Sequence, residues 1–491
     1  MKYLISSRLS LRTKLESQIG PPHIAVDEHN WDDYKSCTYL GVEFSELPPI
    51  DSNILYDFIH CEIIFLKMAD RLLPLGSYQQ RKDEYIKHLR FWNHKITRDL
   101  DFAIFQNIPH EGFDFVIYSI CKARNIKTLC FYSLPIRPNK VYLMHPVQDI
   151  FKSGQEIGDT YLKLNKEIFA NNISIDNIKL PIRNYIYEYN DIDRKVISFT
   201  RSEYKKTFQK EIMRVIKRAG EYIANLKIKL LIIDTIKYFI RRFLSESVLA
   251  RITSSPLYYE TNREVEDYYE RNAAIPNLDL PYIYFPLHYQ PECSTSPLGG
   301  EYANQYLVCE MLAYVASSHN ILIYVKEHPR ASKAVHIRNI AFYEKMLNCK
   351  NVVLVEKSTD SLDLIDKSVA VATITGSAGW EAVLRLKNVL MFGSRFYELA
   401  PGVFKIKSCD DLSNALNLIL SKQGGISQQA LIVYLKAVEE HAFEAFVNQA
   451  DERIATVSKV ESDKNFISAI INYISANGYL QKMHCNKSEK L

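Results

Sequence analysis

The stretches VAVATITGSAGWE, residues 369–381, and ILIYVKEHPR, residues 321–330, decide the expected fold. Each is a run of apolar, largely β-branched residues that stops at a polar turn, and each turn precedes a segment with helical character. In an α/β sheet, such turns present backbone N–H groups to a phosphate. Two of them could hold one nucleotide between them, so the sequence first indicates a nucleotide-using enzyme.

The rest of the second half alternates between strand and helix patterns. Strands are expected at residues 282–286, 321–326, 352–355, 369–374 and 389–392, and helices at 301–318, 337–347, 361–366 and 379–386. This alternation predicts a parallel, doubly wound sheet. A polar turn bracketed by prolines at residues 276–281 suits the boundary of this domain.

The first half contains a βαβ pattern. Its parts are a strand at residues 102–106, a loop at 107–112, a helix at 114–124 and a strand at 128–132. An opening strand at 2–6 precedes helices at 54–73 and 81–99. We predict an N-terminal Rossmann-like domain, a basic helical insertion, a C-terminal Rossmann-like domain, and C-terminal helices with a tail. Their ranges are 1–186, 187–275, 276–425 and 426–491.

Composition excludes several classes of protein. A net charge of +4 is too small to indicate a nucleic-acid partner. Nine dispersed cysteines, with no zinc-site spacing, favour a reducing compartment. The N-terminus lacks the apolar core of a signal peptide, and no run approaches the ~20 apolar residues of a membrane span. A cytoplasmic location is expected. The basic segment is either a solvated helical insertion or a face that rests on the anionic inner surface of the bacterial membrane.

The strand end KEHP, residues 326–329, carries the first candidate binding group. Pro329 suits the first turn of a helix, so His328 would lie at the positive end of the helix dipole. There it could hydrogen-bond a phosphate oxygen or protonate it as the phosphate leaves, and Lys326 adds positive charge. An ordinary strand-to-helix turn explains the same residues.

The turn Thr375, Gly376, Ser377 is the stronger signal. Gly376 permits a tight turn and close approach of a ligand to the backbone. Ser377 can cap the next helix or bond a phosphate. Glu381 is expected in the first helical turn, where it either stabilises the helix start with Ala378 as cap or accepts hydrogen bonds from ribose hydroxyls.

The loop HYQPECSTSPLGG, residues 288–300, follows the first strand of the second domain. We expect it to face the interdomain cleft. Gln290, Glu292, Thr295 and Ser296 suit sugar hydroxyls or phosphate, although a plain surface loop explains each of them equally well.

The corresponding loop of the first half contains His110 and Glu111, with Asp114 close by. We expect a nucleotide-using enzyme of this kind to take a sugar from a nucleotide donor. Such a glycosyl transfer needs a base to activate the acceptor hydroxyl, or a carboxylate beside an oxocarbenium-like centre. We predict that Glu111 serves this role, aided by His110 and Asp114; a helix-start carboxylate is the alternative. The bare DxD pattern at residues 191–193 is interpreted as a solvated turn, so no metal site is predicted.

Taken together, FPLHYQPECSTSPLGG, KEHP, TGSAGWEAVLRLKNVLMFG and the NIPHEGFD loop resemble the bacterial capsule polysaccharide biosynthesis glycosyltransferases, which include the Kdo transferases. The resemblance implies a GT-B architecture, in which two Rossmann-like domains face a cleft and the C-terminal one holds the donor. It also implies a metal-independent reaction without a cofactor, and it favours a CMP-linked acidic sugar such as Kdo. The matching positions are His328, Pro329, Thr375, Gly376 and Ser377.

The expected function is transfer of a sugar from a nucleotide donor to a growing surface polysaccharide or a glycolipid acceptor. Two alternatives remain: a CDP-alditol phosphotransferase of the teichoic-acid type, and a non-catalytic scaffold associated with the membrane. The sequence leaves open the donor sugar and base, the acceptor linkage, the stereochemical outcome, the oligomeric state and whether Glu111 faces the cleft.

Overall fold

A computed structural model describes most of the chain outside the basic segment. The described residues are 2–26, 44–72, 77–137, 140–144, 147–170, 262–290, 292–328, 331, 338–447, 452, 455 and 457–479. The chain divides into two compact units, Met1–Lys179 with Val265–Leu491, and Leu180–Glu264. Most of the predicted helical insertion, including the DxD pattern at 191–193, lies outside the described residues, as does Pro329.

A parallel four-stranded sheet forms the centre of the N-terminal domain, in the order β2-β1-β3-β4. Its strands are β1 (Tyr3–Ser6), β2 (Ile24–Val26), β3 (Phe102–Phe105) and β4 (Lys127–Cys130). The predicted βαβ unit is confirmed, because α6 (Phe113–Ala123) connects β3 to β4 and these strands pair in parallel. Strands β1 and β3 are buried throughout, as expected of a parallel sheet that is covered on both faces.

Among the described residues, five α-helices of the N-terminal half lie outside the βαβ unit. They are α1 (Leu9–Ile19), α3 (Ser52–Asp57), α4 (Ile59–Leu72), α5 (Tyr78–Lys95) and α7 (Gln155–Ala170). The single helix predicted at residues 54–73 is in fact two, α3 and α4, which are separated at Phe58. Helix α5 begins three residues earlier than predicted, because Ser77 and Gln80 form a capping box at its start.

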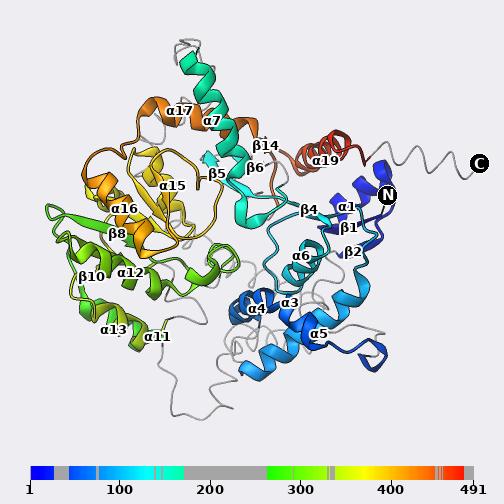
Figure 1. The fold of residues 1–491 in the computed structure, drawn as a ribbon, viewed down its shortest axis with the longest axis horizontal. Helices are drawn as coiled ribbons and strands as arrows, with labels where there is room; N and C mark the ends of the chain where they lie inside the picture. Colours follow the sequence, from blue (N-terminus) through cyan, green and yellow to red (C-terminus); the bar gives the residue numbers. More distant parts are fainter. Residues whose placement is uncertain are drawn as a thin grey trace, which may run out of the picture. The chain divides into compact units, whose positions relative to one another are not determined.

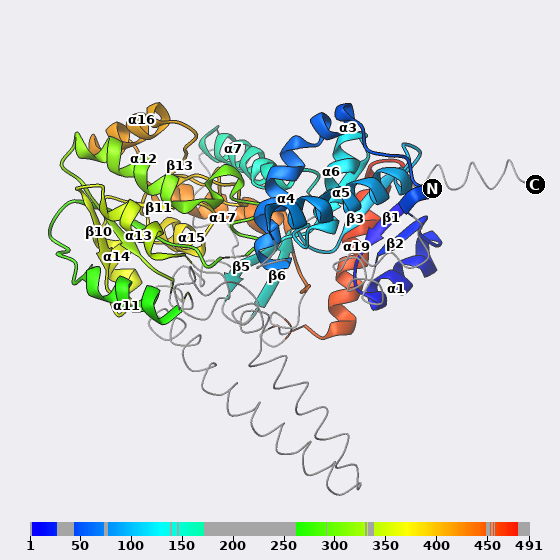
Figure 2. The ribbon, with the colours of Figure 1, turned by 90° about the horizontal axis from the view of Figure 1, so that it is seen from below.

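The C-terminal helix α19 (Lys459–Ala476) completes the core of the N-terminal domain. Its residues Phe466 and Ile470 pack in one buried cluster with Ile5 and Leu15. Figures 1 and 2 show α19, in red, beside α1, in blue. The prediction of a separate region over residues 426–491 is therefore corrected, since the apolar side of the first sheet is covered in part by this returning helix.

A small antiparallel sheet, in the order β14-β6-β5, also joins distant parts of the chain. Its strands are β5 (Ser133–Arg137), β6 (Lys140–Met144) and β14 (Ala442–Glu444). Strand β14 follows α17 (Gln428–Glu440), which packs along α7. The C-terminal segment thus contacts the N-terminal half through three elements: α17, β14 and α19.

The C-terminal domain is built on a parallel seven-stranded sheet, in the order β13-β12-β11-β8-β9-β10-β7. Its strands are β7 (Ala273–Ala274), β8 (Tyr282–Pro286), β9 (Leu322–Lys326), β10 (Val352–Val355), β11 (Ala370–Thr373), β12 (Val389–Met391) and β13 (Val403–Lys405). All five predicted strands are present, with ends shifted by no more than one residue. The α/β fold class with two parallel sheets is confirmed.

Side chains alternate between the two faces of this sheet. Ile283 and Phe285 of β8 point into the main apolar core, whereas Tyr282 stacks on Tyr324 of β9 on the opposite face, with ring centroids 4.4 Å apart. The helices of the domain are α11 (Asn262–Asn272), α12 (Gln305–Ser317), α13 (Ile340–Leu347), α14 (Ser361–Lys367), α15 (Ser377–Leu384) and α16 (Cys409–Leu420), with a short 3₁₀ helix η4 (Gly300–Ala303) before α12.

The start of this domain was predicted too late in the chain. Residues 262–274, assigned above to the insertion, form α11 and the edge strand β7, which pairs with β10. Tyr269 of α11 is buried in the core of the domain, so the boundary at residue 276 falls inside the fold. Among the described residues, no helix has both the length and the apolar character needed to cross a membrane.

Candidate active site

Four neighbouring strands of the second sheet, β12, β11, β8 and β9, end along one edge. After them come, in the same order, residues 393–395, the turn 375–377, His288 and His328. We call this group the His288 edge. In parallel sheets, ligands bind at the carboxyl ends of the strands. The structure therefore places the two predicted phosphate-binding turns at one edge, with the end of β8 between them.

His288 links these turns. Its Nε2 accepts a hydrogen bond from the backbone N–H of Thr375 at 3.1 Å and lies 3.4 Å from Thr373 Oγ1. The side chain is 6% exposed. Burial lowers the pKa of His288 to about 3, and the positive charges of Arg338, His328 and Arg395 act in the same direction. The imidazole is therefore neutral at physiological pH.

The hydrogen bonds of His288 assign its tautomer. Because Nε2 accepts the Thr375 N–H, the ring proton belongs on Nδ1. Nδ1 is buried and makes no hydrogen bond with any described residue. Sequence analysis gave His288 no role; its place as the first polar residue after a buried strand was the available signal.

The turn at residues 375–377 is shaped by packing. Gly376 is the N-cap of α15 with φ −71°, so a left-handed backbone is not what requires glycine there. A Cβ atom at this position would lie 2.9 Å from His288 Nε2 and 3.0 Å from Thr373 Oγ1. The predicted reason for this glycine is thus corrected: it makes room for the imidazole of His288.

The start of α15 has no side-chain cap. The Gly376 N–H donates to Thr373 Oγ1 at 2.9 Å, and Thr375 Oγ1 donates to the Ser294 carbonyl at 2.5 Å. Ser377 is the first helical residue and is exposed. Since the first amides of a helix have no partner within it, this end can receive an anion.

Glu381 does not lie in the first turn of α15, which corrects the prediction. The helix begins at Ser377 rather than after Ala378, so Glu381 is one turn further along and the first turn holds no acidic residue. Burial raises the pKa of Tyr284, whose hydroxyl donates to Ser361 Oγ at 3.4 Å, and the charge of Glu381 acts in the same direction as burial. Its contact with a ribose stays a prediction.

A buried carboxylate, Glu327, fixes the end of β9. The side chain is 1% exposed and accepts hydrogen bonds from Arg338 Nη1 at 2.5 Å, from the Tyr343 hydroxyl and from the His328 backbone N–H at 2.6 Å. The ring of His328 lies 5.4 Å from that of Tyr289. Glu327 therefore holds the backbone that carries His328.

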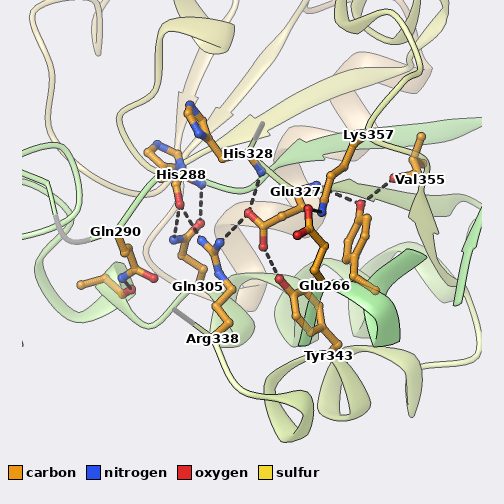
Figure 3. A network of polar contacts seen from close by, with 12 residues as sticks. Glu266, His288, Gln290, Gln305, Glu327, His328, Arg338, Tyr343, Val355 and Lys357 are labelled. Carbon is orange, nitrogen blue, oxygen red and sulfur yellow. Dashed lines mark hydrogen bonds and ion pairs between the residues drawn. The ribbon is translucent and has the colours of Figure 1, made fainter. Parts of the chain in front are cut away.

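The same network reaches His288. Arg338 Nη2 donates to the His288 carbonyl at 2.5 Å, and Gln305 bonds both the N–H and the carbonyl of His288, at 2.7 and 3.2 Å. Figure 3 shows Arg338 reaching from Glu327 to His288. This arrangement sets the positions of the two histidines relative to each other. Sequence analysis missed Glu327, Arg338 and Gln305, because nothing local marks them as partners.

Lys326 is buried and its ammonium group is engaged. Its Nζ donates to the Thr359 carbonyl and, at 2.9 Å, to Ser361 Oγ. Burial lowers the pKa of Lys326 to about 8. These bonds fix the loop that follows β10, and direct contact of Lys326 with a ligand stays a prediction.

The loop at residues 288–300 is closely bonded to itself. Thr295 Oγ1 donates to the Glu292 carbonyl at 2.8 Å, the Ser296 N–H donates to the same carbonyl at 2.9 Å, and Thr295 and Ser296 are buried. Gln290 Nε2 donates to the Ala303 carbonyl at 2.6 Å. These predicted sugar-binding groups shape the loop, and their contact with a ligand is untested.

The loop after β3 forms a separate group, which we call the His110 loop: residues 107–112 with Asp114. The carboxylate of Asp114 accepts the backbone N–H groups of His110 and Glu111 at 3.1 and 2.7 Å. Asp114 is buried, and burial raises its pKa to about 6. Asp114 thus caps the loop, and its role as a catalytic group stays a prediction.

His110 and Glu111 remain accessible. The Glu111 carboxylate is 35% exposed and lies 3.6 Å from His110 Nε2, whose Nδ1 is 2.5 Å from the Ile108 carbonyl. Gly112, with φ +79°, makes the left-handed turn that leads into α6.

Comparison with known proteins gives one family match. Residues 297–414 match the family described as capsule polysaccharide biosynthesis protein. This segment holds His328, the turn 375–377 and residues 393–395, so the predicted resemblance is confirmed over it. No curated protein matches the chain.

Several solved structures are similar at low identity. The β-Kdo 2,7-transferase KpsC of Thermosulfurimonas dismutans is 12% identical over 82% of this chain and 95% of its own, with a TM-score of 0.31. The β-Kdo 2,4-transferase KpsC of that organism is 11% identical over 73% and 88%, with a TM-score of 0.32. UDP-GlcNAc 2-epimerase from Methanocaldococcus jannaschii is 10% identical over 90% and 99%, with a TM-score of 0.29. Because these structures align only loosely with this chain, they carry no argument about its function. The family match over residues 297–414 is the finding that bears on function.

Proposed function

We propose that this protein is a glycosyltransferase of capsule or other surface polysaccharide biosynthesis, and that its nucleotide-sugar donor binds at the His288 edge. One observation carries the proposal: the uncapped start of α15, the neutral His288 and the accessible His328 converge at the ends of neighbouring parallel strands. The family match covers most of this edge.

On the donor side, the chemical task is to stabilise the negative charge that develops on the leaving phosphate. Backbone N–H groups at the start of α15 are fixed in place before the reaction and cost no reorganisation. His288 stays neutral, so it can donate a hydrogen bond but cannot supply a proton at physiological pH. The second histidine of this edge, His328, would therefore act as the general acid toward the phosphate.

On the acceptor side, a base must take the proton from the attacking hydroxyl. Glu111 fits this role, because its carboxylate is partly exposed and next to His110. Asp114 does not, since its oxygens are used by backbone N–H groups. The proposed reaction uses no metal, as the resemblance to the capsule glycosyltransferases implies.

We further propose a CMP-linked acidic sugar, such as Kdo, as the donor and a polysaccharide or glycolipid at the inner membrane surface as the acceptor. The basis is the resemblance over the motifs at residues 326–329 and 375–377. The reaction would break the bond between the sugar and the CMP phosphate and form a glycosidic bond to the acceptor hydroxyl.

A two-stage experiment tests this function. First, the melting temperature of the full chain is measured with CMP, CDP, UDP or GDP added. It should rise most with CMP. Incubation with CMP-Kdo, UDP-sugars and CDP-glycerol, each with a polysaccharide acceptor, should then release CMP with sugar but no phosphorus in the product. Transfer of phosphorus from CDP-glycerol would indicate a phosphotransferase instead. Absence of any nucleotide binding by a folded protein would contradict the proposal.

A further inference from the structure

Arg395, which follows β12, has no counter-ion among the described residues. Its guanidinium forms no hydrogen bond or ion pair with any residue that the structure describes, and it lies over the ring of Tyr132 at 5.8 Å. Other arginines of this domain are paired: Arg338 with Glu327 and Arg385 with Asp366. A half-buried guanidinium left unpaired suits an anionic ligand.

A buried carboxylate close to Arg395 in the sequence, that of Glu398, has other partners. Glu398 is three residues further along, but its side chain accepts hydrogen bonds from Ser394 Oγ, from the Gly154 N–H and from Lys405 Nζ. Glu398 therefore already has its cation in Lys405, at 2.9 Å. Within the described part of the chain, no carboxylate is paired with Arg395.

The backbone around Arg395 is packed against the turn of α15. The Gly393 N–H donates to the Ile374 carbonyl at 2.8 Å, and a Cβ atom on Gly393 would lie 2.4 Å from Thr375 Cγ2. The charge of Arg395 acts on His288 as well, since it is one cause of the lowered pKa of that imidazole. The segment that carries Arg395 thus packs against Thr375, and the charge of Arg395 acts on His288.

We propose that Arg395 binds a phosphate of the donor nucleotide, with the His288 Nδ1–H as a second, neutral donor to the same phosphate. A guanidinium offers two parallel N–H groups that match phosphate oxygens, and the buried Nδ1 of His288 has no other acceptor among the described residues. The start of α15 supplies backbone N–H groups to the same anion. This inference rests on the proposed function, because it names the group that recognises the nucleotide.

The ring of Tyr132 gives this arginine a defined position. Tyr132 follows β4 of the first sheet, is buried, and donates its hydroxyl hydrogen to the Ile150 carbonyl at 2.8 Å. A guanidinium stacked on a fixed ring loses less freedom when it binds a ligand. Tyr132 is accordingly a positioning residue for Arg395.

Calorimetry on the full chain tests the inference. CMP and cytidine are titrated into the wild type and into Arg395→Gln. We expect CMP binding to weaken about 10-fold or more, because a hydrogen-bonded charge pair is lost, and cytidine binding to stay unchanged. Arg385→Gln, which removes a guanidinium paired with Asp366, is the matched control and should bind CMP like the wild type. Arg395→Lys should give an intermediate affinity.

The outcomes separate the two proposals. If the wild type binds CMP and Arg395→Gln binds it equally well, Arg395 is not the phosphate ligand and the proposed function stands. An equal loss of CMP and cytidine binding, or a loss in Arg385→Gln as well, would also overturn the inference, since the change would not be specific to phosphate. If the folded wild type binds no nucleotide, both proposals fail. Circular dichroism confirms folding, and Arg395→Lys serves as the test variant if Arg395→Gln does not fold.

Discussion

The His110 loop and the His288 edge lie at equivalent ends of the two parallel sheets, yet they satisfy their backbone N–H groups in opposite ways. In the first, the buried carboxylate of Asp114 accepts two of them. In the second, the start of α15 has no side-chain cap, and its surroundings are cationic. The second therefore suits an anion better than the first, and on this difference rests our proposal that the nucleotide binds there and the acceptor at the first.

Two buried histidines sharpen the comparison. His88 of the N-terminal domain packs against Phe65 and Phe113, with ring centroids 5.6 and 6.5 Å away, and burial lowers its pKa to about 3. The pKa of His288 is lowered to about the same value. What distinguishes His288 is its position between two strand ends and its bond to Thr375. Burial alone therefore does not identify a site.

The largest effect is expected from His328→Ala. Loss of a general acid should lower turnover by about 100-fold or more, because proton transfer to the leaving phosphate is no longer assisted. The melting temperature should hardly change, since the Glu327 contact uses the His328 backbone. A CMP-release assay measures the effect, and His319→Ala, at the end of α12, is the control. Equal turnover in His328→Ala would remove the assigned role.

Next in size is the loss of stability in Glu327→Gln. This change leaves Arg338 as a buried, unpaired charge, which should cost about 3 kcal/mol of unfolding free energy. Urea denaturation measures it. The control, Glu266→Gln, alters a surface pair with Lys357 and should stay within about 0.5 kcal/mol. Similar stability of the two variants would mean that the network does not hold the two histidines in place.

Gly376→Ala should combine a smaller destabilisation with weaker nucleotide binding. The new methyl group meets His288 Nε2 at 2.9 Å, and such overpacking typically costs about 1–3 kcal/mol. Gly425→Ala is the matched control, because no heavy atom lies within 4 Å of its Cβ position. Calorimetry with CMP and thermal melts would compare the two; unchanged behaviour of Gly376→Ala would refute the packing account of this turn.

The His110 loop should separate stability from activity. Asp114→Ala leaves two backbone N–H groups without their acceptor and should destabilise the protein by about 1–3 kcal/mol. Glu111→Gln should keep the wild-type stability within about 0.5 kcal/mol and lose turnover. If Glu111→Gln retained full turnover in the transfer assay, the acceptor-side base would have to be sought elsewhere.

The smallest effect concerns pH. The unfolded chain protonates His288 near pH 6.5, whereas the folded chain does so only near pH 3. Between these values the unfolded state binds the additional proton, so stability falls as the pH is lowered, by at most about 1.4 kcal/mol per pH unit. His288→Gln should reduce this slope between pH 7 and 5 in urea denaturation. An identical slope in the variant would show that His288 takes up its proton at the same pH in the folded and unfolded states, which would contradict its lowered pKa.

The sequence predicted the strands of the second sheet well, because short apolar runs such as residues 369–374 are rich in β-branched residues and end at turn residues, as is typical of a strand buried on both faces. It also predicted that the ends of β9 and β11 carry polar turns. The partners of those turns could not be predicted. His288 and Thr375 are 87 positions apart, and Arg8 and Asp463, which join α19 to the first sheet, are 455 apart. Such contacts depend on tertiary packing, which no local pattern encodes.

The errors have physical causes of the same kind. Glycine at position 376 suggested a special backbone, whereas the constraint is the volume of an imidazole from another strand. For Asp114, the sequence indicated a catalytic carboxylate and missed the helix-start role, in which its oxygens accept the nearby N–H groups of His110 and Glu111. Residue type and spacing in the sequence indicate where a site lies. The packing and hydrogen bonds of each group depend on its neighbours in the fold.

The most direct test of the central claim is a crystal structure of the full chain with CMP bound. We predict phosphate density beside the backbone N–H groups at the start of α15, within hydrogen-bonding distance of Arg395 and of His288 Nδ1. Phosphate density at the His110 loop, or anywhere other than the His288 edge, would contradict the account.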